Sequence, residues 1–326
     1  LFELRRKVLR QCIAAAGMSR DRRKLTMKHI LDFCGGTKDG TCVAFGHFDG
    51  IHLGHRAVIE KVCAHEGLVP VIVSADETFK PVIYTEREKE ELLKETGVEI
   101  MVSVNARDYD SMTADELCSA VAGKLNAKVV VAGENICFGS DNKGIAELKA
   151  LGEKYGFAVE SVPVVYHNGE EVSTAAVMKA IEDKDFNKMS ELLGHVYIMM
   201  GRVVHGKAAG RKHGMPTANL GVAANKLFPP HGVYGTLSII DGRYYRGMTN
   251  IGLRPSDDDI PIATIETFIL NFDQDIYEKD VLLQVYAYIR GVKKFSGGLD
   301  EVRKQIDKDI QDVKSYMDEV VRKLGI

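Results

Sequence analysis

TCVAFGHFDGIHLGHRAVIEKVCAHEGLVPVIVSA, residues 41–75, is the stretch that decides the fold of the first half of the chain. It opens with a short apolar run (41–45), continues with helical spacing up to Gly67, and returns to a β-branched run at 69–75. A strand, a helix and a strand in this order predict a crossover connection between parallel strands. The loop between the first strand and the helix then lies at the carboxyl edge of the sheet, where open α/β sheets bind ligands.

The same alternation continues along the first half. Further helices are expected at 86–97, 115–126 and 144–156, and further strands at 98–104, 127–133 and 158–167. Strands separated by helices of about 10–15 residues are typical of a parallel sheet covered by helices. The sequence therefore predicts a Rossmann-like, doubly wound α/β domain over residues 27–185.

Strand-like segments without helices between them dominate the second half. A short helix is expected at 185–194, and apolar strand segments follow up to residue 291, punctuated by Gly and Asn. Asp241-Gly242 between two such segments is a strong hairpin signal. This pattern predicts a small antiparallel barrel or sandwich over residues 186–326. One amphipathic helix at 299–325 is expected to pack against it.

The composition excludes several classes of protein. The 326 residues are 45% hydrophobic and 27% charged, which argues against disorder. No stretch approaches the roughly 18 consecutive apolar residues of a membrane span. A net charge of −3 argues against a general nucleic-acid binder. Six cysteines with neither a C-x-x-C pair nor zinc-type spacing are expected to be free thiols in a reducing cytoplasm. The sequence leaves the oligomeric state open.

Residues 1–26 differ in charge from the rest of the chain. They hold eight basic and two acidic residues, whereas the remaining 300 residues hold 35 basic and 44 acidic ones. An Arg-rich segment that is poor in acids is also typical of transit peptides. We expect residues 1–26 to be a basic extension outside the fold.

The decapeptide GHFDGIHLGH (46–55) carries the first candidate site. Its glycines let backbone approach a phosphate, and the N-terminus of the following helix attracts an anion. His52 and His55, three residues apart at that turn, can point at one phosphate and donate N–H groups to charge that builds on it. The alternative is a glycine-rich turn with surface histidines.

The segment GRVVHGKAAGRKHGMPTANL (201–220) carries the second candidate site. Backbone amides and cations in such a segment can wrap a polyphosphate. Thr217 and Asn219 project to the same side of an extended segment, and neutral oxygen ligands of this kind suit Mg²⁺. The alternative is a basic, glycine-rich hairpin whose Pro-Thr only turns the chain.

The motifs of the first half resemble those of the bacterial FAD synthetase module. GHFDGIHLGH is similar to its signature G-x-F-D-G-x-H-x-G-H, GENICFG (133–139) to its G-x-[DN]-F-x-F-G segment, and VSTAAVM (172–178) less closely to its I-S-S-T-x-I-R motif. The resemblance implies adenylylation of FMN by ATP, with His52 and His55 as catalytic residues. The residues that the resemblance implies as contacts of ATP and its phosphates are Gly46, Asp49, Gly50, Gly54, Asn135, Ser173 and Thr174.

Some positions depart from that pattern. The family has Arg where this chain has Met178, Thr where it has Ala175, and Asn where it has His47. SADETFKP (74–81) stands near the place of the family's T-F-x-P-x-P segment. Because loss of a permanently charged, bidentate donor is not conservative, we expect adenylyl transfer to be weakened.

The second half resembles riboflavin kinase. Residues 201–219 follow the signature G-x-V-x-x-G-x-x-x-G-R-x-x-G-[FM]-P-T-A-N, and similarity continues through GMTNIGLRPS (247–256) and IETFILNFDQDIYEKDV (265–281). The resemblance implies a barrel that phosphorylates riboflavin with ATP and Mg²⁺, with Glu266 as catalytic base and Thr217 and Asn219 as Mg²⁺ ligands. It also implies a flavin-binding loop with Asn250 and Arg254. The implied phosphate contacts are Gly201, Gly206, Gly210 and Arg211.

The two resemblances follow one another in the order of the bifunctional riboflavin kinase/FMN adenylyltransferase family. They imply ATP, riboflavin and FMN as partners, and neither nucleic acid nor membrane. One alternative is a riboflavin kinase whose first domain is degenerate. A second alternative is a non-enzymatic sensor of flavin or nucleotide.

Overall fold

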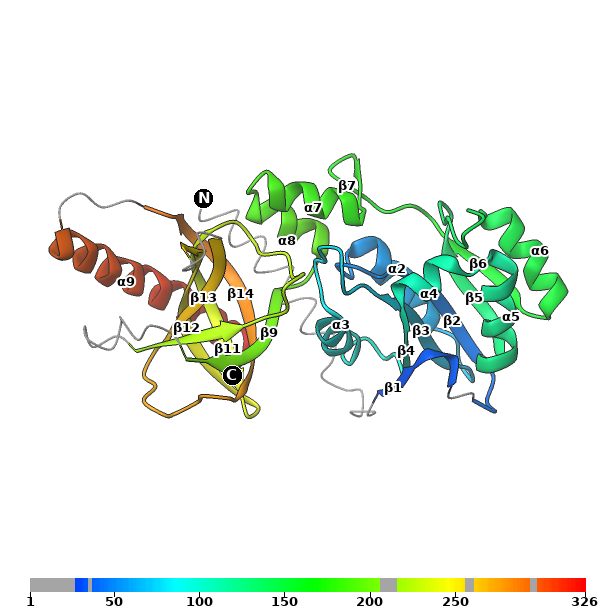
Figure 1. Cartoon of the computed structure of the whole chain (residues 1–326), viewed down its shortest axis with the longest axis horizontal. Helices are drawn as coiled ribbons and strands as arrows, with labels where there is room; N and C mark the ends of the chain where they lie inside the picture. Colours follow the sequence, from blue (N-terminus) through cyan, green and yellow to red (C-terminus); the bar gives the residue numbers. More distant parts are fainter. Residues whose placement is uncertain (1–26, 35–36, 206–215, 256–260, 294–297) are drawn as a thin grey trace. The chain divides into compact units, whose positions relative to one another are not determined.

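The computed structural model describes residues 27–34, 37–205, 216–255, 261–293 and 298–326 (Figure 1). These residues form two compact units that divide between Val177 and Met178, within helix α7 (Thr174–Glu182). The domain boundary at residues 185/186 stays a prediction. The basic extension 1–26 and the positions Gly206, Gly210 and Arg211 lie outside the described residues.

The first unit is built on a six-stranded parallel sheet with the order β1-β4-β3-β2-β5-β6. From β2 the chain adds β3 and β4 on one side, then returns to the other side of β2 to add β5 and β6. This reversal confirms the doubly wound α/β class. The strands are β1 (Lys28–Leu31), β2 (Thr41–Gly46), β3 (Val69–Asp76), β4 (Ile100–Asn105), β5 (Ala127–Gly133) and β6 (Ala158–Val162).

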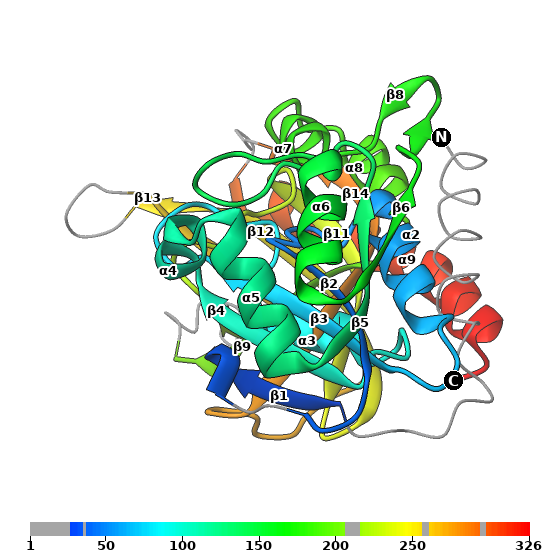
Figure 2. The ribbon, with the colours of Figure 1, turned by 90° about the vertical axis from the view of Figure 1, so that its right-hand side faces the viewer.

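Helices cover both faces of this sheet, with α5 and α6 on one face and α2 on the other (Figure 2). Leu117, Val121 and Leu148 are buried in the apolar cluster of the first face, and Ile59 and Val62 in that of the second. The helical elements are η1 (Asp32–Cys34), α2 (Leu53–Cys63), α3 (Glu86–Leu93), α4 (Ala106–Ser111), α5 (Ala114–Leu125) and α6 (Ile145–Tyr155).

Local sequence explains where these elements begin and end. Thr85 and Thr113 start α3 and α5 with reciprocal capping boxes, and Asn126 ends α5 in the left-handed conformation. The single strand predicted over 158–167 is wrong beyond Val162, because Pro163 has no N–H to donate to the sheet. The chain continues there into a short hairpin of β7 (Tyr166–His167) and β8 (Glu170–Glu171).

The second unit is a closed antiparallel barrel with the order β10-β13-β12-β11-β14-β9. Closure between β9 and both β10 and β14 decides between the barrel and the sandwich that the sequence pattern left open. The predicted Asp241-Gly242 hairpin joins β11 to β12, with φ values of 50° and 75° as a type I′ turn requires. The strands are β9 (Tyr197–Val204), β10 (Thr217–Gly221), β11 (Gly232–Ile240), β12 (Arg243–Pro255), β13 (Pro261–Ile269) and β14 (Asp280–Gly291).

Two helices complete this unit, the short α8 (Phe186–Leu193) and the long α9 (Gly298–Leu324). Helix α9 buries Val313 and Met317 against Leu237 of the barrel. Arg290 of β14 donates to both carboxylate oxygens of Asp309 on α9, at 3.0 and 2.6 Å. Among the helices in the described part of the chain, none is long and apolar enough to span a membrane.

Two glycines of the first unit give a matched test of backbone conformation. A Cβ added at Gly67 or Gly123 would meet no atom within 4 Å, so packing opposes neither substitution. Gly67 has a φ of 78°, whereas Gly123 lies inside helix α5. We expect Gly67→Ala to lower the free energy of unfolding by about 1 kcal/mol and Gly123→Ala to raise it by about 0.5–1 kcal/mol. Thermal unfolding measures both changes, and shifts of the same sign would contradict the expectation.

Candidate active sites

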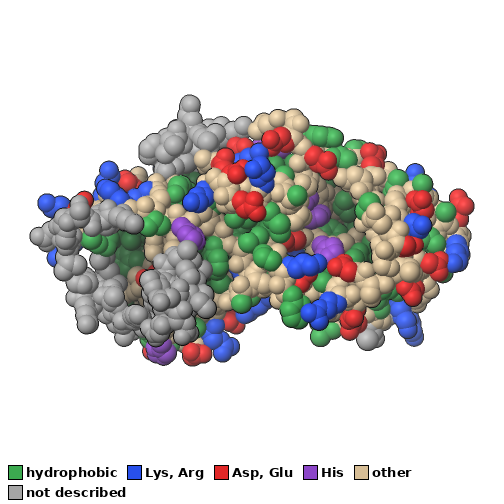
Figure 3. All heavy atoms as spheres, turned by 45° about the horizontal axis from the view of Figure 1, so that its top comes forward, with side chains coloured by type: hydrophobic (Ala, Val, Ile, Leu, Met, Phe, Trp, Pro, Cys, Tyr) green, Lys and Arg blue, Asp and Glu red, His purple; other side chains and the backbone are tan. Residues whose placement is uncertain are grey.

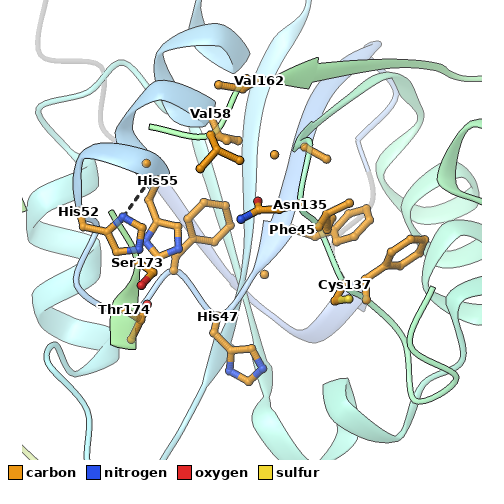
Figure 4. A pocket seen from close by; sticks show the side chains of 18 of the residues that line it. Phe45, His47, His52, His55, Val58, Asn135, Cys137, Val162, Ser173 and Thr174 are labelled. Carbon is orange, nitrogen blue, oxygen red and sulfur yellow. Dashed lines mark hydrogen bonds between the residues drawn. The ribbon is translucent and has the colours of Figure 1, made fainter. Parts of the chain in front are cut away.

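A cavity of about 540 Å³ lies where the strand order of the first unit reverses (Figure 4). It is lined by Gly46 at the end of β2, Gly133 at the end of β5 and Val162 at the end of β6. Open α/β sheets bind ligands at this kind of switch point. The predicted site residues that line the cavity are Gly46, His52, Gly54, His55, Asn135, Ser173 and Thr174, and those that do not are Asp49 and Gly50.

The loop that follows β2 has an unusual backbone. Phe48 and Ile51 adopt positive φ values of 48° and 41°, which are uncommon for residues with a side chain. The buried carboxylate of Asp49 accepts hydrogen bonds from the amides of Ile83 and Tyr84, at 3.0 and 2.9 Å. Asp49 thus anchors the loop to the segment before α3, and its contact with a phosphate stays a prediction.

The two histidines of the motif lie side by side at the start of α2. His52 is the N-cap residue of the helix, and its Nδ1 accepts a hydrogen bond from the amide of His55 at 3.3 Å. The two rings stack with centroids 3.7 Å apart and planes 19° apart. A Cβ at position 54 would come within 3.2 Å of the His52 ring, which explains why glycine stands there. The structure therefore brings His52, Gly54 and His55 together at the start of α2, and their contacts with a phosphate stay predictions.

His55 is a neutral imidazole at physiological pH. Burial is the main cause that lowers its pKa well below 6.5, and the charges of His52, Lys89 and His47 lower it further. Its Nδ1 is shielded from solvent and has no hydrogen-bond partner among the described residues. A neutral ring with an unsatisfied nitrogen that lines a cavity can exchange a hydrogen bond with a ligand there.

Polar side chains from other elements complete the wall of this cavity. The hydroxyl of Thr174 donates to the carbonyl of Asp49 at 3.0 Å. This bond connects the start of α7 to the loop between β2 and α2, residues 47–52, which we call the histidine loop. Ser173 Oγ accepts from the amide of Ala176 at 3.2 Å. Asn135 Nδ2 donates to Glu171 on β8 at 2.7 Å. The predicted contacts from three separate motifs thus line one cavity.

A buried lysine that the sequence pattern did not indicate lies next to the histidine loop. Lys89 of α3 is 3% exposed, and its Nζ donates to the carbonyl of His47 at 3.1 Å and to Ser74 Oγ at 2.8 Å. Glu86 balances its charge at 2.8 Å. A Lys three residues after a Glu on an expected helix is normally a solvated pair. Only the packing of α3 against the strand ends gives it this position.

Strand pairing brings together the polar residues of the second candidate site. Glu266 on β13 is the register partner of Asn219 on β10 and of Asn250 on β12. Its neighbours Ile265 and Thr267 are buried, so the Glu266 side chain faces the opposite side of the sheet. Directly paired residues have Cβ atoms about 4.5–5.5 Å apart, so the three side chains form one row.

Thr217 lies two residues before Asn219 on β10 and also lines a second cavity of about 540 Å³. The other side of this cavity is formed by residues 272–277, between β13 and β14. Of the described residues that line it, Thr217 is the one that the sequence analysis assigned to Mg²⁺. Thr217 therefore lies in the wall of a cavity that is large enough for a small molecule.

Other predicted contacts of this site have a different local explanation or lie outside the described residues. A Cβ at Gly201 of β9 would collide with the carbonyl of Gly221 on β10, so close strand pairing already requires glycine there. Arg254 lies within β12, where its side chain is not described. The phosphate contacts of Gly201 and Arg254's place in a flavin loop stay predictions.

Charge is mixed over the face of the molecule that Figure 3 shows. Lys and Arg side chains lie interspersed with Asp and Glu over the face shown in Figure 3, and histidines border a hollow in its right-hand half. This agrees with the modest net charge of −3. The described residues of this face therefore form no large basic patch.

Two family models match the chain. One, described as FAD synthetase, matches residues 36–176, and the other, described as riboflavin kinase, matches residues 193–317. The first match contains the cavity lined by His47, His52 and His55, which we call the histidine cavity. The second match contains the row formed by Asn219, Glu266 and Asn250.

Relatives match over most of the chain. A bifunctional riboflavin kinase/FMN adenylyltransferase of Escherichia coli (strain K12) is 30% identical, with 83% of this chain and 91% of the relative covered. A protein of the same name from Bacillus subtilis (strain 168) is 28% identical, with 84% and 92% covered. A crystal structure titled as a macrolide-efflux protein from Streptococcus pneumoniae has a TM-score of 0.77 and 30% identity, with 88% of this chain and 99% of that chain covered. Macrolide efflux is a description of the Streptococcus pneumoniae protein and not of this chain.

His55 links the stability of the first unit to pH. Because its pKa is well below 6.5 in the folded unit, the unfolded chain binds a proton near pH 6.5 that the folded unit does not bind. The contribution of neutral His55 to the free energy of unfolding is therefore present above pH 6.5 and is lost as the pH falls below it. We expect the wild-type protein to lose about 1 kcal/mol more unfolding free energy than His55→Gln between pH 7.5 and 5.5. Urea unfolding at both pH values measures this difference, and equal losses would contradict it.

Proposed function

The chain belongs to the bifunctional riboflavin kinase/FMN adenylyltransferase family, and from this premise we propose that it phosphorylates riboflavin to FMN and adenylylates FMN to FAD. ATP is the second substrate of both steps, and pyrophosphate leaves in the second. We assign the first step to the barrel and the second to the doubly wound unit. The free thiols Cys42, Cys63, Cys118 and Cys137 support a reducing compartment such as the cytoplasm.

The row of Asn219, Glu266 and Asn250 carries the proposal for the kinase. A carboxylate that strand register places between two amide side chains can accept a proton from a substrate hydroxyl. In the proposed step, Glu266 takes the proton of the ribityl hydroxyl as its oxygen bonds to the γ-phosphorus of ATP. The bond between that phosphorus and the β-phosphate oxygen breaks, and ADP leaves.

The family's kinases need a divalent metal ion, and we propose Mg²⁺ with Thr217 and Asn219 as its ligands. The described residues hold no group of three or more His, Cys, Asp and Glu side chains suited to a metal. The residues present fit Mg²⁺ well, because this ion takes few protein oxygens and shares the phosphates of its nucleotide. When bound, it would neutralise charge on the transferred phosphoryl group.

The stacked pair of His52 and His55 carries the proposal for the adenylyltransferase. In that step a phosphate oxygen of FMN bonds to the α-phosphorus of ATP, and the bond to the β-phosphate oxygen breaks to release pyrophosphate. Negative charge builds on the oxygens around the α-phosphorus. N–H groups of the two imidazoles and the free amides at the start of α2 are positioned to stabilise it.

A kinase with a weakened first unit is the second candidate function. Two observations favour it: Met178 and Ala175 replace residues that the family uses on phosphates, and no Lys or Arg stands among the described lining residues of the histidine cavity. Both candidates include riboflavin kinase activity. They differ in the rate at which FMN becomes FAD.

Replacing Glu266 tests the kinase assignment. Glu266→Gln keeps the size of the side chain but removes its ability to accept a proton, so FMN formation from riboflavin should fall at least ~10²-fold. Glu278→Gln makes the same change at an exposed position that pairs with Arg202, and should leave the rate unchanged. Steady-state FMN production measures both. Near-normal turnover of Glu266→Gln would overturn the assignment of the base.

The purified protein with FMN, ATP and Mg²⁺ separates the two candidate functions. We expect FAD to form more slowly than FMN forms from riboflavin, because losing the arginine at position 178 removes a charge-assisted contact. Met178→Arg should raise the rate of FAD formation about tenfold without changing the kinase rate. Rapid FAD production by the wild-type protein would show that these departures are harmless.

A further inference from the structure

The histidine cavity has an unusual lining for a site that handles phosphates. Of the described residues that line it, three are histidines, two are the carboxylates Asp110 and Glu171, and none is Lys or Arg. ATP, FMN and pyrophosphate are all anions, and cationic donors strengthen contacts with phosphate. Among these side chains, only a histidine can provide a positive charge.

His52 and His55 are poorly suited to that task. His52 is 5% exposed, and its ring stacks on that of His55. Burial keeps the pKa of His55 well below its usual range. Two imidazoles in face-to-face contact also disfavour a charge on both. His55 is therefore suited to donate a neutral N–H group rather than to supply charge, and the ring of His52 is shielded from solvent against it.

His47 differs from the other two histidines in its surroundings. Its side chain is 49% exposed, and Nε2 lies 3.0 Å from Oδ1 of Asp110. Its ring meets Tyr109 edge-on, with centroids 5.6 Å apart. Figure 4 shows it apart from the stacked pair. His47 is therefore an accessible imidazole that lines the cavity and whose ring is oriented by the carboxylate of Asp110.

The charges around His47 come from three helices. The titratable groups that face it are Asp110 and Tyr109 of α4, Lys89 and Glu86 of α3, and His55 of α2. Burial raises the pKa of Tyr109, so its phenol stays neutral. Lys89 donates to the His47 carbonyl, and Glu86 balances its charge. The charge in direct contact with the His47 ring is the carboxylate of Asp110.

We propose that His47, held by Asp110, is the proton-dependent phosphate-binding residue of this cavity. The inference rests on the adenylyltransferase function proposed above. With a neutral ring, the His47–Asp110 pair has a net charge of −1 and repels an anion. With a protonated ring, the pair is neutral and presents a charged N–H donor. A phosphate group therefore binds together with one proton from solvent, and Asp110 acts as the positioning residue.

Pyrophosphorolysis of FAD by the full-length protein tests this proposal. In this reverse reaction FAD and pyrophosphate give FMN and ATP, and the KM for pyrophosphate is measured from pH 6.0 to 8.5. His47→Lys carries a permanent charge, and His47→Asn carries none. His65→Asn is the matched control, since His65 forms a surface pair with Glu160 at 3.5 Å and does not line the cavity. Thermal unfolding of the same samples verifies that the first unit of each variant is folded.

Because pyrophosphate itself titrates, the readout is the ratio of KM values between proteins at each pH. We expect KM of His47→Asn to exceed that of the wild type about tenfold at pH 6.0 and to approach it at pH 8.5. His47→Lys should show the opposite trend, with its advantage over the wild type growing as the pH rises. His65→Asn should follow the wild type. A ratio for His47→Asn that is constant with pH would overturn the proposal.

Calorimetry separates failure of this proposal from failure of the adenylyltransferase function. Pyrophosphate is titrated into each protein in two buffers of different ionisation enthalpy, which gives the protons taken up on binding. Greater uptake by the wild type than by His47→Asn supports the proposal even if no FAD chemistry occurs. FAD chemistry with equal uptake in both proteins overturns the proposal alone. Absence of both overturns the proposal and the function together.

Discussion

The carboxylate of Asp49 makes the interaction on which the first site depends. It accepts from the amides of Ile83 and Tyr84 and holds a loop in which Phe48 and Ile51 have positive φ. Such backbone conformations cost about 1–3 kcal/mol each and persist only where the surroundings enforce them. Burial of Phe48 and Ile51 at 4% and 2% exposure adds to that enforcement. The result is a fixed start for α2.

That fixed start determines the chemistry of the cavity. Because His52 serves as the N-cap of α2, its ring lies against that of His55 one turn later. Burial, and to a lesser extent the neighbouring His52, keeps the pKa of His55 well below its usual value, so its ring is neutral and can donate one N–H group. The second site is built differently, from side chains that strand register places in one row on a barrel. In the functions proposed above, each site binds phosphates through a few local groups.

The fold was predictable from the sequence to a large extent. Alternating strands and helices predicted the doubly wound unit. Asp241-Gly242 predicted the hairpin between β11 and β12 of the barrel, because a type I′ turn suits two residues with positive φ. The contacts within GHFDGIHLGH were also predictable, because residues three apart at a helix start are neighbours. The pairing of Asn219 with Glu266 was not, because strand register depends on which faces are buried.

By itself, the sequence determined the doubly wound class of the first unit, the antiparallel β character of the second, the order of the motifs and the position of His52 and His55 at a helix start. All of these follow from local periodicity and turn chemistry. Only the tertiary structure decided that Lys89 is buried beside the loop, that Asp49 faces the amides of Ile83 and Tyr84, and that Asp110 lies at His47. Those contacts join segments far apart in the chain. Local pattern carries no information about them, because they arise from which strand ends the sheet order places together.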